Sequence, residues 1–330
     1  MKLINENKLK ENNTMKNTSQ SITKKITQKV ADSIIECLER GIVPWSCPYI
    51  NKIGQPKNFY GKNYVGVNRW VLNSSVMKNN FPVNTWITFN KCRQEEGHIL
   101  KGSKGTTVVL WKFLTREVDK IDAKTGATKK VTKTFPMLKS FTVFNMSQTS
   151  LYKPEEVTEE PKKEVEVNVA MAEQLVSDWN ETVDIRYGFD NLSSPYYAPF
   201  SDYINIPFGE SVEWVNEESL HKTIFHEMLH STGHKSRLDR FDKAVMDGVD
   251  ADKLHSRGNY SAEELVAEMG SQILADICDF KQDHIEDTSA YIGSWIKCLK
   301  SNPEWVIWAG RRAEMGVDMI LNNSICEGGK

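Results

Sequence analysis

The residues whose types and spacing could do chemistry are His226, Glu227 and His230, in segment 223–234. On an α-helix, residues four positions apart lie one turn above one another on the same face, so both imidazoles can converge on one metal ion. Histidine nitrogens suit zinc, and Glu227 stands beside them, able to orient and deprotonate a water molecule. This five-residue pattern is a weak signal by itself, because a chain of 330 residues can contain it by chance. Its surroundings therefore decide whether the site is real.

A zinc site built for catalysis has three protein ligands and one open position, so one more ligand must be found. A histidine six residues after His230 would complete the metzincin pattern, but that position is Ser236, which excludes the class. His234 follows one turn after His230, and a continuous helix cannot bring three successive turns onto one ion. Gly233 could interrupt the helix, so His234 stays open as an alternative ligand.

We expect the third ligand to be Glu264, in the helix predicted by the pattern of residues 260–268. Glu264 and Glu268 lie one turn apart, so the first can bind the ion while the second fixes a ligand histidine from behind, or itself replaces Glu264 as ligand. Ser261 and Glu264 also have the spacing of a capping box, in which Glu264 only satisfies the first amides of the helix and Glu263 is a solvated surface residue. Burial decides between these interpretations, because two carboxylates buried together without a cation are costly.

The elements that position these residues can be predicted from local patterns. Asn216 can cap a helix that carries both histidines and turns an apolar face to the core. Extended segments are predicted at 183–187 and 196–207, and the second is placed where an edge strand of zincins holds the substrate backbone. Later apolar stripes at 290–299 and 305–321 predict helices that pack behind the metal-binding helices.

The composition is that of a globular protein that is not exported. Hydrophobic residues make up 39% and charged residues 26% of the chain. No apolar run approaches the roughly 20 residues that cross a bilayer, and the amino terminus lacks the apolar segment of a signal peptide. The six cysteines form no Cys-x-x-Cys pair and are interpreted as free thiols. We therefore expect a cytoplasmic protein without a membrane partner.

The net charge of −2 hides an asymmetry between the two halves. Residues 1–150 carry 25 Lys and Arg against 10 Asp and Glu, a balance of +15, and the remaining residues carry 17 against 34, a balance of −17. A basic half is what a phosphate backbone would select, so a nucleic acid is the expected partner. Residues 97–104 have the two glycines of a P-loop but no Lys after the second, and a β-branched strand follows, so an NTPase is not expected.

Aromatic and basic residues alternate in this half, as single-stranded nucleic acid requires, because bases stack on rings while cations follow the phosphates. Most of these rings belong to the core, and we expect Trp86, Trp111 and Phe144 to be buried. The candidates for DNA binding are flanked by turn residues or are themselves basic. The stacking candidates are Trp45, Tyr60 and Tyr64, and the basic candidates are Lys62, Arg69, Lys101 and Lys104.

Four regions follow from these patterns. Residues 1–16 form a tail without structure, and residues 17–150 form a small α+β domain with an antiparallel sheet that binds nucleic acid. A charged, proline-containing linker is predicted at 151–167, and residues 168–330 form a mainly helical domain. The predicted fold class is α+β.

Several segments of both halves resemble the ArdC-type antirestriction proteins of conjugative plasmids and mobile elements. In the basic half the similar segments are residues 43–45, 58–68, 86–89, 100–106 and 142–145; in the acidic half they are residues 225–238, 263–270 and 291–296. The resemblance implies a single-stranded-DNA-binding domain fused to a zincin-like metallopeptidase domain, and protection of transferred DNA from host restriction. A fold does not establish turnover, so cleavage is left open.

Three functions therefore compete. The first is an antirestriction protein that binds single-stranded DNA and carries a zinc site of glutamate-zincin type, with Glu227 catalytic. The second is a zinc peptidase that cleaves DNA-associated proteins, with the basic half as localiser. The third is a DNA-binding protein whose zinc site is catalytically idle. The ligand set favours zinc, although manganese could occupy the same site.

Overall fold

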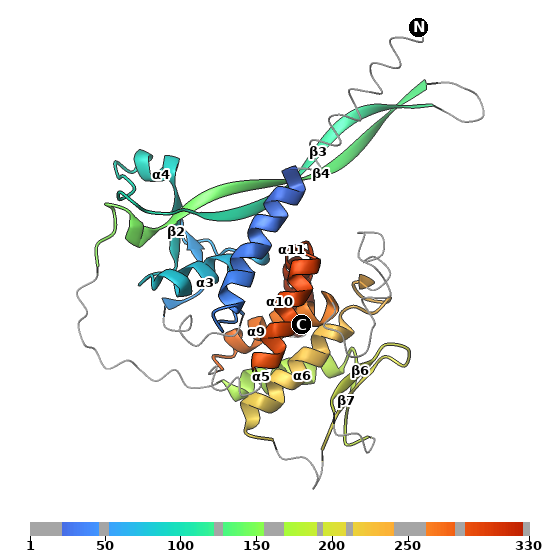
Figure 1. Ribbon diagram of the computed structural model, residues 1–330. Helices are drawn as coiled ribbons and strands as arrows, with labels where there is room; N and C mark the ends of the chain where they lie inside the picture. The colour runs from blue at the N-terminus through green and yellow to red at the C-terminus, as the bar shows by residue number, and fades with distance from the viewer. Residues whose placement is uncertain are drawn as a thin grey trace.

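The computed structural model describes residues 22–45, 53–121, 128–154, 168–189, 194–208, 214–240, 262–280 and 288–325. Helices and two separate sheets share this part of the chain (Figure 1), which confirms the predicted α+β class with a mainly helical second half. The predicted tail and most of the predicted linker lie outside the described residues. No helix in the described ranges is long and apolar enough to cross a membrane.

The first described element is a helix over residues 22–38, as the apolar spacing predicts. Val30, Ile34 and Leu38 are buried on one of its faces. Gly41 follows with a φ of 74°, a left-handed conformation that glycine adopts without steric cost, and the chain turns there.

The amino-terminal sheet has four strands and is mixed. Across the sheet the strands are β1 (Lys57–Asn58), β2 (Thr85–Thr88), β4 (Thr128–Asn145) and β3 (Thr106–Ile121). The predicted antiparallel pairing holds for β2 with β4 and for β4 with β3, but β1 is parallel to β2. Figure 1 shows the hairpin of β3 and β4 reaching away from the rest of the molecule. The structure describes β3 up to Ile121 and β4 from Thr128.

Two helices complete this region: α3 (Val67–Asn79) and α4 (Phe89–Gln94). Strand β2 leads directly into α4, because the side chain of Thr88 accepts a hydrogen bond from the amide of Lys91 and so caps the helix. Trp86 is buried beside α3, as predicted, whereas Trp111 and Phe144 are half-buried. A 3-10 turn, η1 (Met146–Gln148), ends the last strand.

The second half begins with α5 (Val169–Asn180) and a three-stranded sheet. The strands are β5 (Asp184–Tyr187), β7 (Tyr203–Ile206) and β6 (Tyr196–Ala198), in that order across the sheet. Four further helices follow: α6 (Glu217–Ser231), α9 (Ala262–Ile277), α10 (Thr288–Ser301) and α11 (Trp305–Ile325). Helix α9 packs against α6 on one side and against α11 on another, so α11 lies behind the pair that carries the proposed ligands.

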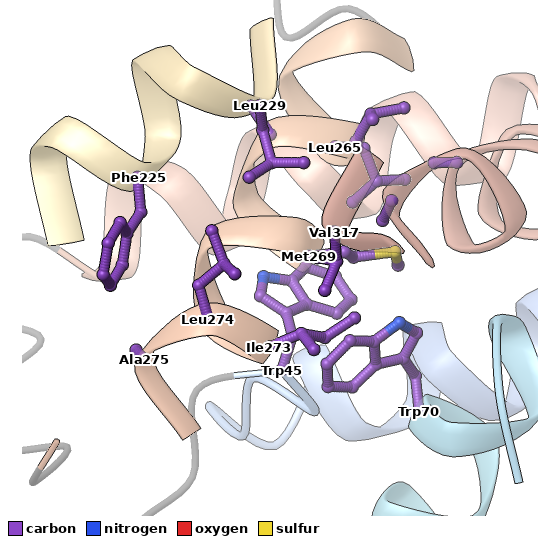
Figure 2. Close-up of a cluster of buried hydrophobic side chains, with 14 of the residues drawn as sticks. Trp45, Trp70, Phe225, Leu229, Leu265, Met269, Ile273, Leu274, Ala275 and Val317 are labelled. Carbon is purple, nitrogen blue, oxygen red and sulfur yellow. The ribbon is translucent and has the colours of Figure 1, made fainter. Parts of the chain in front are cut away.

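One hydrophobic cluster contains side chains of both halves. Trp45 and Trp70 from the first half lie among side chains of α9 and α11, including Met269, Ile273 and Val317 (Figure 2). Burial of aromatic rings of this size contributes strongly to stability. The halves with opposite charge are therefore packed together rather than joined only by a tether.

Candidate metal centre

Helix α6 carries the His-Glu-x-x-His motif, and its start is fixed by a capping box. The side chain of Asn216 accepts a hydrogen bond from the Ser219 amide at 2.8 Å, and the Asn216 amide donates to Ser219 Oγ at 3.2 Å. The apolar face predicted for this helix is largely buried, which sets its rotation about its axis. His226 and His230 then face α9, the neighbouring helix.

Three side chains converge between α6 and α9. The Nε2 atoms of His226 and His230 are 3.1 Å apart, and the two rings meet edge to face. The carboxylate of Glu264 spans both, with one oxygen 3.3 Å from His226 Nε2 and the other 3.5 Å from His230 Nε2. In the described part of the chain, these are the residues whose donor atoms group within 4.8 Å as a metal site would require.

The donor set of His226, His230 and Glu264 fits a divalent ion such as zinc. Bonds of about 2.0–2.1 Å at tetrahedral angles place two donors about 3.3 Å apart, which is close to the separations found here. Two imidazoles and one carboxylate also leave a fourth position for water or substrate. The Glu264 side chain is 43% exposed while the histidine side chains are 20% and 13% exposed, so the group is open to solvent on one side.

Ionisation in this cluster reflects how tightly the groups are coupled. Burial opposes the charged form of His226 and of His230, yet hydrogen bonds that their rings donate raise both pKa values: to Glu264 for His226, and to Glu263 and then Glu264 for His230. Burial would raise the pKa of Glu264, but the two histidines lower it below its ordinary range. A bound cation would replace the proton in this arrangement, because metal ligation requires neutral imidazole.

Glu227 and Glu268 lie close to the three converging residues without belonging to them. Glu227 is buried, and its negative charge is among the causes that raise the pKa of both histidines. Burial, followed by the charge of Glu264, raises the pKa of Glu268. Both carboxyl groups therefore interact electrostatically with the converging residues, and their roles in chemistry stay predictions.

Two residues behind His230 were not identified from the sequence. Glu263 Oε1 lies 3.4 Å from His230 Nδ1, and Arg240 donates hydrogen bonds to both oxygens of Glu263. Glu263 is 4% exposed, so the capping interpretation, which makes it a solvated surface residue, is wrong on this point. Ser261, the partner in that capping box, lies outside the described residues. The signal that could have identified Glu263 is its position next to Glu264 in the sequence. No sequence signal pointed to Arg240.

His234, the alternative ligand, has other neighbours. Its Nδ1 is 2.7 Å from Ser236 Oγ and 3.5 Å from Asp202 Oδ2, and it is not part of the converging group. Helix α6 ends at Ser231, one turn before His234. The ring is thereby turned toward the hairpin of β6 and β7.

Arg237 fastens that hairpin to the end of α6. It donates to Asp202 Oδ2 at 3.0 Å, to the hydroxyl of Tyr197 at 3.1 Å and to the carbonyl of Ser231 at 2.7 Å. Asp202 has a left-handed φ of 53° in the turn between β6 and β7. The edge strand β6 is thus held against α6 near its carboxyl end, and the predicted role of this strand in holding a substrate backbone stays a prediction.

The residues predicted to bind DNA are not equally accessible. Tyr60 is 74% exposed on a turn in which Asn58 Oδ1 accepts hydrogen bonds from the amides of Tyr60 and Lys62. Lys91 Nζ lies 5.0 Å from the centre of the Tyr60 ring. The other exposed candidates are Lys62, Lys101 and Lys104, and Tyr64 is half-buried.

Two of these candidates are corrected by the structure. Trp45 is 3% exposed, and the edge of Trp295 packs against it, so neither face of its ring is free for a base. Arg69 is 8% exposed and forms an ion pair with Glu314 of α11, so its charge is already neutralised. Both residues contribute to the contact between the two halves.

Comparison with known proteins places both halves in one family. Residues 24–144 match the family model for the N-terminal domain of anti-restriction factor ArdC, and residues 170–312 match the zincin-like metallopeptidase model. The two matches follow in this order and cover most of the chain. The chain belongs to the ArdC-type antirestriction family. The resemblance noted from the sequence is confirmed.

Solved structures agree with this assignment. The metal-free crystal structure of the antirestriction ArdC protein from the R388 plasmid is similar with a TM-score of 0.63 and 28% identity, over 91% of this chain and 97% of that one. The Mn(II)-bound structure of the same protein gives 0.63 and 27%, over 90% and 97%. A divalent metal is therefore expected for this family, although zinc is not the ion seen in that relative.

Curated relatives extend the comparison. A DNA primase TraC from Escherichia coli is 31% identical over 309 residues, which are 88% of this chain but 26% of the primase. A second TraC primase is 32% identical over 19% of its length. The uncharacterized protein y4eC of Sinorhizobium fredii (strain NBRC 101917 / NGR234) is 26% identical over 87% of this chain and 88% of y4eC. The chain thus spans about a quarter or less of the primases it matches.

Proposed function

We propose that this antirestriction protein binds single-stranded DNA through its basic half and holds a divalent ion at His226, His230 and Glu264. The observation that carries the proposal is the convergence of these three side chains. The two Nε2 atoms lie 3.1 Å apart, and each lies within 3.5 Å of one oxygen of Glu264. Zinc is the ion we propose, because two imidazoles and a carboxylate form a typical catalytic zinc set. Manganese is the alternative ion, because the similar ArdC protein from the R388 plasmid has a Mn(II)-bound structure.

The second part of the proposal is hydrolysis of a peptide bond. The ion would polarise the carbonyl and make a water molecule more acidic. Glu227 is the general base that takes the proton from the attacking water and later delivers it to the leaving amine, so that the C–N bond breaks and no other reactant is needed. An extended peptide can align along β6, which has one unpaired edge among the described strands.

The DNA-binding part rests on the turn of Tyr60 and the neighbouring cations. An exposed ring beside Lys62 offers a face for stacking and positive charge for the phosphates, while Lys91, which lies over the ring, is paired with Glu95. Lys101 and Lys104 are further exposed cations of the same half. Because bases of any identity can stack, the proposal is binding without strong sequence preference.

The experiment that tests this function uses the full chain and the variant Glu227→Gln. Affinity for single-stranded and duplex oligonucleotides of equal length is measured across salt, and tighter, salt-dependent binding of the single strand is expected. Equal affinity for both forms, or no binding, contradicts the DNA-binding part.

Cleavage and protection are then measured for the same variant. Glu227→Gln should keep its bound metal and lose cleavage of proteins on DNA, because the amide cannot accept the proton. If wild-type protein cleaves nothing and the variant still protects DNA from restriction, the hydrolysis part is wrong and the centre is catalytically idle.

A further inference from the structure

Glu263 and Arg240 form a buried ion pair directly behind the proposed metal centre. Arg240 Nε donates to Glu263 Oε2 at 2.8 Å, and Arg240 Nη2 donates to Oε1. Arg240 is 2% exposed and Glu263 is 4% exposed. Glu263 precedes Glu264 on α9, so one carboxylate meets the front of the histidine pair while the other reaches His230 from behind.

The position of Glu263 bears on which nitrogen of His230 carries a hydrogen. A neutral imidazole has one N–H donor and one lone pair. His230 Nε2 faces His226 Nε2 at 3.1 Å and Glu264 at 3.5 Å, so it is the nitrogen available to an ion. The hydrogen then belongs on Nδ1, where Glu263 Oε1 is the acceptor at 3.4 Å. Without that acceptor, the tautomer with a hydrogen on Nε2 would compete for the same ring.

Arg240 also connects the two helices that carry the proposed ligands. Beyond Glu263 on α9, it donates to the carbonyl of Leu229 and to the hydroxyl of Thr232 at the end of α6, both at 2.8 Å. The last carbonyls of a helix have no partner within the helix, so this guanidinium satisfies one of them. One side chain therefore holds α6, α9 and the acceptor for His230 together.

A buried ion pair is a poor way to gain stability, because desolvation offsets most of the attraction. The pair is better explained by what it touches. We propose that Glu263, oriented by Arg240, is a positioning residue that keeps His230 in the tautomer able to bind a divalent ion through Nε2. This inference rests on the proposed metal centre but concerns residues outside its ligand set.

Zinc affinity of the full chain tests the proposal, measured after metal removal by competition with a chromophoric chelator. Glu263→Gln should bind zinc about 10–100-fold more weakly, the usual effect of losing a partner of a ligand histidine. Glu263→Asp keeps the charge for Arg240 but withdraws the carboxylate from Nδ1, so it should fold like wild type by circular dichroism and still lose affinity. Wild-type affinity in both variants overturns the proposal.

A double variant tests whether Arg240 acts through Glu263. Arg240→Gln alone should weaken zinc binding, and Glu263→Gln combined with Arg240→Gln should bind no more weakly than Glu263→Gln alone. If the losses of zinc affinity in the two single variants add in the double variant, Arg240 only caps α6, and the proposal that it acts through Glu263 is overturned.

Imidazole nitrogen spectra of the metal-free proteins, recorded at a pH where the rings are neutral, provide a readout that loss of stability alone would not move, because a zinc ion on Nε2 would itself hold the hydrogen on Nδ1. Wild type should show His230 with hydrogen on Nδ1, and Glu263→Gln should show a mixture of tautomers. An unchanged tautomer in Glu263→Gln contradicts the inference. Wild-type protein that binds no zinc or manganese at all instead contradicts the proposed metal centre, so the two failures are distinguishable.

Discussion

Arg69 of α3 and Glu314 of α11 form an ion pair between the half that matches the ArdC N-terminal domain and the half that matches the metallopeptidase, with Nε and Oε1 3.2 Å apart. The same Glu314 oxygen accepts a hydrogen bond from the Gly66 amide, and Arg69 also donates to Gln55. Gln55 in turn donates to Asp276 on α9, the helix whose first turn carries the proposed ligand. The proposed DNA-binding half is therefore joined by polar contacts to α9, which carries Glu264, and to α11, which packs against α9.

The close approach of Gly310 to the start of α3 gives the first prediction. A Cβ at Gly310 would lie 2.7 Å from the backbone nitrogen of Val67, and backbone cannot move aside as a side chain can. Gly310→Ala should lower the free energy of unfolding by about 1–3 kcal/mol, the usual cost of overpacking. Urea denaturation of the full chain measures this change.

Gly293 of α10 supplies the matched control. A Cβ there meets no atom within 4 Å, so Gly293→Ala should be neutral or add up to about 1 kcal/mol through the entropy of the unfolded chain. A Gly310→Ala variant that is as stable as Gly293→Ala would mean that the two halves are not packed at this contact.

The metal centre predicts opposite pH trends with and without zinc. In the metal-free protein, the raised pKa values of His226 and His230 contribute stability that is fully present below about pH 6.5, the ordinary histidine value, and is lost as pH rises through the higher values of the folded state. Zinc requires the neutral rings, so the stabilisation that it gives should grow as pH rises.

Thermal unfolding with chelator or with zinc, at pH 5.5 and pH 8, measures both trends. Zinc at 100 times its dissociation constant should add about 2.7 kcal/mol at the higher pH. In Glu264→Gln the effect of zinc should shrink strongly at both pH values. A zinc effect that is equal at both pH values would show that the ion binds elsewhere.

The local part of this site could be predicted from the sequence because its signals are local. Asn216 and the apolar spacing define the start and the rotation of α6, and the four-residue interval of His226 and His230 then places both rings on one side. The donor at position 264 follows from a second helix pattern. Such signals depend on neighbours within one or two turns of helix.

The rest depends on contacts between distant segments. Arg240 and Glu263 form a hydrogen bond although they are 23 positions apart in the sequence. Trp45 and Arg69 stand next to turn residues, which predicted exposure, but α10 and α11 cover them, and Glu314 follows Arg69 by 245 positions. Spacing along the sequence contains no record of which side chain a later helix will cover.

The exposed ring of Tyr60 should contribute to DNA binding by stacking on a base. Tyr60→Leu removes an exposed ring without disturbing the core and should weaken binding of a single-stranded oligonucleotide by about 1–3 kcal/mol, roughly 5- to 150-fold. Tyr187→Leu is the matched control, because Tyr187 is an exposed tyrosine of the acidic half. Equal effects of the two changes would exclude a specific stacking role.

The charge of Lys62 should contribute to DNA binding through contact with a phosphate. Loss of one phosphate contact in Lys62→Met should reduce the slope of log affinity against log salt by about 0.7, the value for single strands. Lys300→Met, in the acidic half, removes a cation paired with Glu39 and should leave the slope unchanged. Fluorescence anisotropy at four salt concentrations resolves this difference.

The contact between the β6–β7 hairpin and the end of α6 gives the last prediction. The ion pair of Asp202 with Arg237 is the test, and the ion pair of Asp184 with Arg186 on β5 is the control. Asp202→Asn leaves the Arg237 side chain, which is 8% exposed, without its anion, and should cost about 1.5–3 kcal/mol, the contribution of hydrogen bonds to a charged group. Asp184→Asn breaks the exposed pair with Arg186 and should change stability by less than about 1 kcal/mol. Urea denaturation in the presence of chelator compares them without interference from metal. If both variants lose the same small amount, the Arg237 contacts do not hold the hairpin, and β6 is then free to leave the end of α6.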